Sequence, residues 1–248
     1  MQNIWSRDEL LIAFNLYCKI PFTKINSRYK PVMDVANIIG RSNNALAMKL
    51  ANFARLDPAL QARGIKGLRG GSKSEEIIWN EFSEDWAALS YESELLLAKL
   101  GKNNLVREFD LNRLGLSKEA TVKVRINQHF FRNAVLSSYN NQCCITGICI
   151  PEILIASHII PWAIDENNRV NPQNGVCLNA LHDKAFDKGL ISITNDFKII
   201  VSEKILKLKG NQDLDIITKF NGKEIKKPQK FLPKEEFLDY HFNNIFQK

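Results

Sequence analysis

Four histidines occur in the chain, and two of them stand 24 residues apart in settings that suit catalysis. His158 follows an apolar run at 153–157, which places it at the end of a strand or the start of a loop. His182 lies in the stretch 179–187, which has a helical composition and ends near a glycine. A neutral histidine can take a proton from an attacking water, while a divalent cation held on a neighbouring helix stabilises extra negative charge. The alternative is two unrelated histidines, one packed beside Trp162 and one within a helix.

The elements that position these histidines follow a simple order. Residues 171–175 read Asn-Pro-Gln-Asn-Gly, which predicts a turn, and residues 176–178 predict a short strand after it. The order is therefore strand, loop, strand and helix, with one histidine on the first element and one on the last. Residues 191–201 then predict two strands around a polar turn, and Pro233 opens a last helix.

The first part of the chain predicts three helices. Ser6 with Glu9 three residues later forms the pattern of a capping box, and the helix that follows ends at Pro21. A short second helix ends at Gly40, and Ser42 caps a third, which ends near residue 57. A helix, a glycine turn and a capped helix form the outline of a helix-turn-helix.

The charge of the stretch 41–73 agrees with that outline, because it holds seven basic residues against one acid, Asp57. Side chains near the start or the exposed side of a recognition helix can reach phosphates or base edges. We therefore predict that residues 1–100 are a helical region that binds DNA, and a three-helix bundle with a basic surface is the alternative. The side chains expected to contact DNA are Arg41, Asn43, Asn44, Lys49 and Arg55.

Composition excludes several classes of protein. With 45% apolar residues the chain can build packed cores, and no apolar run is long enough to span a bilayer. The first residues lack the pattern of a secretion signal, so a cytoplasmic location is expected. Five cysteines without a Cys-x-x-Cys pair indicate reduced thiols rather than a structural zinc site.

Charge is distributed unevenly along the chain. The net charge is +7, yet residues 141–203 hold four basic against seven acidic residues, and residues 204–248 hold ten basic against six acidic. An acidic centre between basic flanks suits a cation site framed by phosphate-binding segments, and a solvated lysine-rich tail is the alternative for the last segment.

Four blocks of residues carry a resemblance to a known family. These blocks read CITG at 144–147, ASHIIPW at 156–162, NPQNGVCL at 171–178 and LHDKAFDKGLI at 181–191. With them the sequence resembles the HNH nucleases, and within them the branch found in bacterial restriction-type endonucleases. Residues in the segments 125–139 and 238–241 also resemble those of that branch.

The resemblance implies a ββα-metal fold and a role for each central residue. It implies that His158 is the general base that activates water and that Asn174 braces the loop and orients the base. His182 takes the last position of the motif, which implies a metal ligand. Many relatives carry an aspartate immediately before the first histidine as a second ligand, and this chain has Ser157 there.

Two aspartates near the last histidine are substitute ligands. Asp183 and Asp187 are four residues apart and share one face of the predicted helix, while His182 points about 100° away from Asp183. Asp187 is expected to act on the metal, or else to cap the helix or pair with a lysine. Mg²⁺ or Mn²⁺ suits such oxygen ligands, and Ni²⁺ or Zn²⁺ can suit imidazole. Arg169 and Lys188 are expected to hold the scissile phosphate, with exposed surface as their alternative role.

We therefore expect an α+β protein with a helical DNA-binding region at 1–100, a linker at 101–123 and a ββα-metal HNH nuclease domain at 124–248. The expected function is metal-dependent hydrolysis of double-stranded DNA in restriction or phage defence, with or without a need for modified bases. Since one ββα site cuts one strand, double-strand cleavage requires a homodimer or two binding events. The alternatives are an inert HNH fold that only binds DNA and a nuclease on RNA or on branched or single-stranded DNA.

Overall fold

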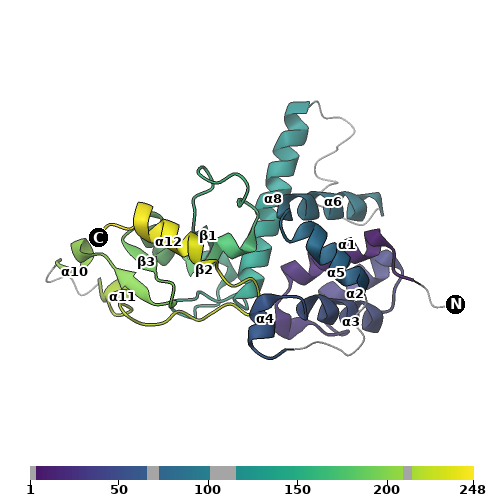
Figure 1. Ribbon diagram of the computed structural model, residues 1–248, viewed down its shortest axis with the longest axis horizontal. Coiled ribbons are helices and arrows are strands. Elements are labelled where there is room, and N and C mark those ends of the chain that lie inside the picture. The colour runs from purple at the N-terminus through teal and green to yellow at the C-terminus, as the bar shows by residue number, and fades with distance from the viewer. Residues whose placement is uncertain (1–3, 66–72, 101–115, 209–213) are drawn as a thin grey trace.

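Two halves of the molecule, one all-helical and one containing small sheets, are joined by a long helix (Figure 1). The computed structural model describes residues 4–65, 73–100, 116–208 and 214–248. The elements, in chain order, are α1 (Arg7–Lys19), η1 (Phe22–Lys24), α2 (Lys30–Ile39), α3 (Asn43–Ala54), α4 (Pro58–Ala62), α5 (Lys73–Phe82), α6 (Trp86–Lys99), α8 (Leu116–Ser138), η3 (Pro151–Ile153), β1 (Leu154–His158), η4 (Pro172–Asn174), β2 (Gly175–Asn179), α9 (Ala180–Asp187), β3 (Ile191–Ile193), β4 (Ile199–Val201), α10 (Glu203–Leu206), α11 (Asp215–Thr218) and α12 (Glu235–Asn244).

The capping residues of the first three helices lie where the sequence predicts, although α3 ends at Ala54, three residues before its predicted end. The Ser6 side chain accepts a hydrogen bond from the Glu9 backbone N–H, and the Glu9 carboxylate accepts one from the Ser6 N–H at 2.7 Å, so the capping box is confirmed. The second helix ends at Gly40, which adopts a left-handed conformation with φ of 69°. The Ser42 side chain caps α3 by accepting from the N–H of Ala45. Local capping chemistry therefore determines this part of the fold.

The C-terminal half has the predicted order of strand, loop, strand and helix. Strands β1 and β2 pair antiparallel, with His158 opposite Gly175 and Leu154 opposite Asn179. The Asn179 side chain then accepts from the backbone N–H groups of Leu181 and His182 and so starts α9 directly after β2. The predicted strand pair after residue 190 is also confirmed, as the antiparallel pair β3 and β4.

Helix α8 contributes to both hydrophobic cores. Phe130 and Ala134 pack into the core of the N-terminal helices, while Phe131 and Val135 pack into the core of β1, β2 and α9. Residues four apart lie on the same face of a helix, and neighbouring residues point about 100° apart, so the two pairs occupy two different faces. Of the predicted linker 101–123, residues 116–123 form the first turns of this helix and residues 101–115 lie outside the described residues. The two halves thus pack on two neighbouring faces of one helix.

A second connection between the halves runs through the segment around Lys230. The Lys230 ammonium is fully buried and donates to the carbonyls of Tyr17, Cys18 and Ile20 at 2.5, 3.0 and 2.8 Å. Burial lowers the pKa of Lys230 to about 8, so the amine still carries its proton at neutral pH. These carbonyls lie at the end of α1 and have no partner within the helix, so the lysine caps it. The segment around Lys230, in the C-terminal half, therefore stabilises the N-terminal helices directly.

The last helix, α12, is fixed to the C-terminal core by a buried histidine. His241 stacks on Phe186 of α9 with 3.7 Å between ring centroids, and its Nε2–H donates to the Phe186 carbonyl at 3.2 Å. Its Nδ1 lies 2.8 Å from the Ser192 hydroxyl of β3, which donates to it. A ring that donates on one nitrogen and accepts on the other is neutral. Burial lowers the pKa of His241 to about 4, which agrees with this arrangement.

The stability of the protein should therefore depend on the protonation of His241 in acid. Between pH 6.5 and about pH 4 the unfolded chain binds a proton at this residue and the folded protein does not. The free energy of unfolding should fall as the pH drops through that window, by about 1.4 kcal/mol per pH unit from this residue. Urea denaturation at pH 7 and pH 5 should show a smaller loss for His241→Gln than for the wild type. An equal loss in both proteins would contradict the prediction.

Candidate active site

His158 lies at the end of β1 with its ring held on three sides. The ring stacks face to face on Phe131 of α8, with 3.8 Å between centroids and 10° between planes. Trp162 contacts it edge-on at 5.6 Å, and its Nε2 lies 2.9 Å from the backbone oxygen of Arg169. A carbonyl oxygen only accepts hydrogen bonds, so Nε2 carries the proton and Nδ1 carries the lone pair of the neutral ring. Burial lowers the pKa of His158, and the hydrogen bond to Arg169 opposes this shift.

The stacking on His158 requires a glycine on the neighbouring strand. Gly175 lies opposite His158 in the sheet, and a Cβ atom built there would lie 2.9 Å from Phe131 Cζ and closer still to Val135 Cγ2. A side chain at this position would therefore push α8 away from β2. Because Phe131 sits on the same helix, the absence of a side chain at Gly175 allows its ring to reach the imidazole.

Asn174 makes the contacts that a brace for the loop after β1 requires. It is fully buried, and its Oδ1 accepts from the Ile160 backbone N–H at 2.8 Å. Its Nδ2 donates to the carbonyls of Ile160 and Asn168 at 3.1 and 3.2 Å. One side chain thus ties the start of the loop to its end, next to His158.

The remainder of this loop is held by Arg169 and Asp165. The Arg169 Nε donates to the Trp162 carbonyl at 2.7 Å, and its Nη2 lies 3.0 Å from Glu166 Oε1. Asp165 accepts from the backbone N–H groups of Asn167 and Asn168. The Arg169 guanidinium thus fixes the loop and its carbonyl orients His158, while its expected contact with a phosphate stays a prediction.

A cavity of about 440 Å³ opens beside His158 between β1 and α9. Burial raises the pKa of Asp183, and the nearby charge of Asp187 raises it further, although the Ser157 hydroxyl opposes this shift. Burial also raises the pKa of Asp187, which Lys184 and Lys188 oppose. The polar and charged residues that line the cavity are Ser157, His158, Asp183, Lys184, Asp187 and Lys188.

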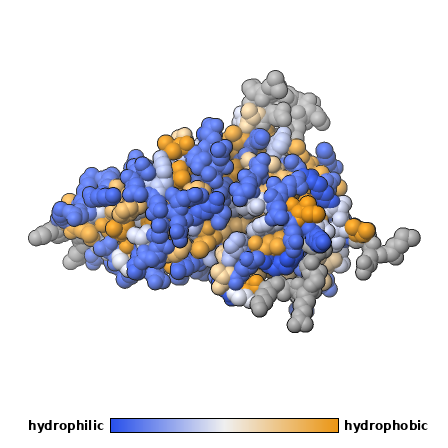
Figure 2. Space-filling view, viewed as in Figure 1, coloured by the Kyte–Doolittle hydropathy of each residue, from blue (hydrophilic) through white to orange (hydrophobic). Residues whose placement is uncertain are grey.

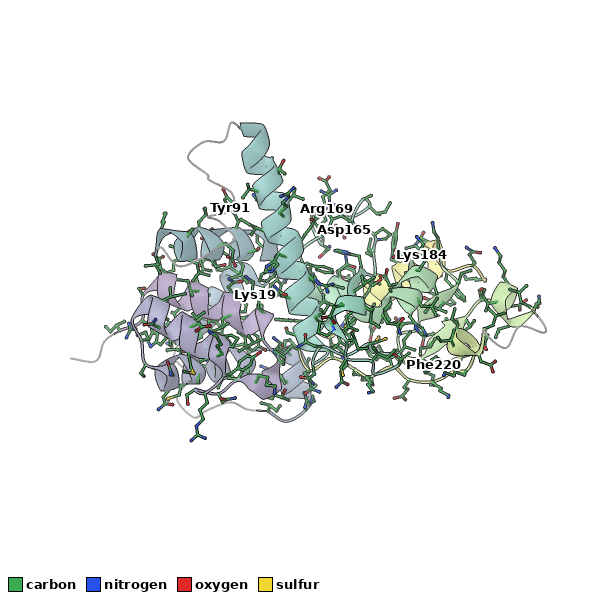
Figure 3. The ribbon with its side chains drawn as sticks, turned by 180° about the vertical axis from the view of Figure 1, so that it is seen from behind. Lys19, Tyr91, Asp165, Arg169, Lys184 and Phe220 are labelled. Carbon is green, nitrogen blue, oxygen red and sulfur yellow. The ribbon has the colours of Figure 1, made fainter. Side chains whose placement is uncertain are left out.

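His182 does not line this cavity. Its ring is buried, its Nδ1 lies 3.0 Å from Asn179 Oδ1, and it contacts Phe220 edge-on at 5.6 Å. Figure 3 shows Phe220 on the opposite edge of the C-terminal half from Lys184 and Arg169. The turn of about 100° between neighbouring residues of a helix places His182 in the core and Asp183 in the cavity.

The donors in the cavity fit a hard divalent cation. Burial raises the pKa values of the two carboxyl groups, so a cation bound between them would stabilise their ionised forms. The Ser157 hydroxyl lines the same cavity and is a further oxygen donor. Ser157 and Asp187, two of the three expected ligands, line this cavity, whereas His182 does not, and metal binding by these residues stays a prediction. No cluster of three or more histidine, cysteine, aspartate or glutamate ligands occurs in the described parts of the chain, so water and substrate oxygens would complete the coordination.

Three basic residues of the N-terminal half that are expected to contact DNA form ion pairs within the protein. Arg41 forms two hydrogen bonds with Glu9, at 2.6 and 2.8 Å, and Lys49 pairs with the buried Glu75 at 2.6 Å. Arg55 likewise pairs with Glu76 at 2.8 Å. On the same helix, Asn44 is exposed and Asn43 partly exposed. These ion pairs stabilise the packing of α3, and they leave less basic surface there than the sequence predicts.

One residue of the site was not assigned a role from the sequence. Phe131 lies within the segment 125–139 of the family resemblance, and the structure places its ring on the His158 ring. Gly175 in β2 leaves space for the Phe131 ring, so this contact could be predicted only if the register of β1 and β2 were known.

Substitution of Gly175 should separate α8 from the site. We expect Gly175→Ala to lower the free energy of unfolding by about 1–3 kcal/mol, because the added methyl group overlaps Val135 and Phe131. Removing methyl groups from the other side should relieve part of that overlap. In a double-mutant cycle measured by urea denaturation, Val135→Ala should therefore cost less in the Gly175→Ala background than in the wild type. Additive effects would contradict the close contact.

Comparison with known protein families gives a match within the C-terminal half of the chain. Residues 143–194 match the family model HNH_2, described as HNH endonuclease, and this segment contains the loop, both strands and α9. In the search of curated proteins, nothing matches the chain. Among the described helices, none has the length and apolar character that a membrane crossing requires. The chain thus carries an HNH endonuclease domain in its C-terminal half.

Proposed function

We propose that this protein is a metal-dependent endonuclease that hydrolyses phosphodiester bonds of DNA. The observation that carries the proposal is a neutral histidine with a free lone pair beside a cavity that holds two carboxylates and two lysines. A base, a cation site and phosphate-binding groups are the three requirements for this hydrolysis. The match to the HNH family model over the same residues supports it independently.

His158 acts as the general base in this proposal. A water oxygen attacks the phosphorus, its proton moves to Nδ1 of His158, and the bond from phosphorus to the leaving sugar oxygen breaks. The hydrogen bond from Nε2–H to the Arg169 carbonyl stabilises the imidazolium that forms. Asn174 maintains this geometry through the loop that it braces.

We assign the metal to Asp183, with Asp187 and Ser157 beside it, rather than to His182. Oxygen donors favour Mg²⁺ or Mn²⁺, and such a cation would neutralise negative charge on the phosphate and on the leaving oxygen. His182 positions α9 through Asn179 and Phe220. Ni²⁺ and Zn²⁺ are less suited to this set, because the imidazole expected to bind them lies in the core.

Lys184 and Lys188 are the phosphate-binding residues in this proposal. Both line the cavity beside the carboxylates, and both are exposed at its rim. Figure 2 shows a mainly hydrophilic surface over the C-terminal half on this face of the molecule, with hydrophobic residues in small groups. The positive charge that a phosphate requires is supplied in this proposal by the two lysines.

A restriction or phage-defence role remains our proposal for the biology, on the resemblance of the sequence blocks to that branch. One site of this kind cuts one strand, so we further propose that double-strand cleavage uses two copies of the chain. The N-terminal half would then position the duplex, with Asn43 and Asn44 at the start of α3 as its contacts.

Plasmid cleavage by purified protein tests the proposed chemistry. With Mg²⁺ or Mn²⁺ the wild type should nick supercoiled DNA, and EDTA should abolish nicking. We expect His158→Ala and Asp183→Asn each to lower the rate by at least about 100-fold, because one loses the base and the other the metal ligand. His129→Ala is the matched control, since His129 is an exposed histidine on α8 that does not line the cavity.

Two outcomes of this experiment would overturn parts of the proposal. If the wild type binds DNA yet cuts no substrate with any metal, the protein is an inert HNH fold that binds DNA. If Asp183→Asn keeps full activity while a folded His182→Gln variant loses it, His182 and not Asp183 holds the metal.

A further inference from the structure

A second cavity lies on the other side of His158 and continues the first. It measures about 310 Å³ and lies between α8 and β1, whereas the metal-binding cavity lies between β1 and α9. Both cavities are lined by the same four residues, Ile155, Ala156, His158 and Trp162. The two cavities therefore form one groove that passes the general base.

The two ends of this groove differ in chemistry. The end at α9 carries Asp183, Lys184, Asp187 and Lys188, all of them charged. At the α8 end the Arg132 guanidinium donates to the carbonyls of Leu154 and Pro151 at 2.8 and 3.2 Å, so two of its nitrogens are engaged within the protein. The other groups at this end are the amide of Gln128, the indole ring of Trp162 and the apolar side chains of Ile155 and Ala156.

Trp162 is held in a fixed orientation at the junction of the two ends. The Arg169 guanidinium lies 5.3 Å from the centroid of its indole ring, and Arg169 Nε donates to its backbone carbonyl. A fixed indole ring is a suitable surface for stacking of a planar ligand, and stacking on aromatic side chains accepts any base. The exposed Gln128 amide can both donate and accept hydrogen bonds, as the edge of a nucleobase does.

We propose that the α8 end of the groove binds a nucleobase of the strand that is cut, next to the scissile phosphate at the α9 end. This inference rests on the proposed nuclease function and adds to it a subsite for an unpaired base. A base inside a duplex is paired and stacked, so it must leave the helix to stack on Trp162. The protein should therefore prefer DNA in which the base at the cut is bulged, mismatched or easily extruded.

Binding to two DNA duplexes that differ by one base tests this subsite. Fluorescence anisotropy in EDTA compares a duplex carrying one bulged nucleotide with the same duplex carrying an abasic site there. Wild-type protein should bind the bulged base about 10-fold more tightly than the abasic site. Gln128→Ala and Trp162→Ala should each reduce that preference, whereas Lys188→Ala should weaken binding to both duplexes by the same factor.

Gln128→Ala decides the outcome if Trp162→Ala disturbs the loop, because Gln128 is exposed on a helix. Gln61→Ala is its matched control, an exposed glutamine on α4 that lies outside the groove. Equal affinity of the wild type for both duplexes would overturn the base subsite and leave the proposed function intact. A lack of binding to either duplex would count against the proposed function itself.

Discussion

The contact of the Phe131 ring with the His158 ring is the interaction on which the rest of the site depends. It joins His158, the general base in our proposal, to the helix that both hydrophobic cores share, since Phe130 on the same helix packs into the N-terminal core. The contact excludes water from one face of the imidazole, and burial lowers its pKa so that the ring is neutral. The hydrogen bond to the Arg169 carbonyl then selects the tautomer. Packing and one backbone acceptor are thus sufficient to prepare a base.

Helix α9 divides its residues between structure and chemistry. His182 faces the core, where Asn179 and Phe220 hold it, and Asp183 faces the cavity with Asp187 one turn later. In the proposed site, the two carboxylates therefore come from α9, while β1 supplies His158 and the Ser157 hydroxyl.

Much of the fold could be predicted from sequence because it depends on local rules. The capping box at Ser6, the glycine end of α2, and the order of strand, loop, strand and helix around His158 are all confirmed. Each of them is decided by residues within a few positions of one another. The residues of the cavity could be predicted only in part. Helical periodicity places Asp183 and Asp187 on one face and His182 on another, but it does not say which of these faces lines the cavity.

Long-range pairing could not be predicted in the same way. Arg41 and Lys49 looked like DNA contacts, but their partners Glu9 and Glu75 lie 32 and 26 residues away in the chain. Lys230 looked like part of a solvated basic tail, yet it is buried against α1, more than 200 residues earlier. Charge runs in a sequence do not reveal which cations are already neutralised inside the fold.

The protonation state of His158 is the most direct measure of this account. ¹⁵N NMR of histidine-labelled protein at neutral pH, with the signal assigned by its loss in His158→Ala, reports which ring nitrogen carries the proton. The account predicts a neutral ring with the proton on Nε2 and a bare Nδ1. A neutral ring protonated on Nδ1, or an imidazolium at neutral pH, would contradict it, because neither form could accept the proton of water at Nδ1.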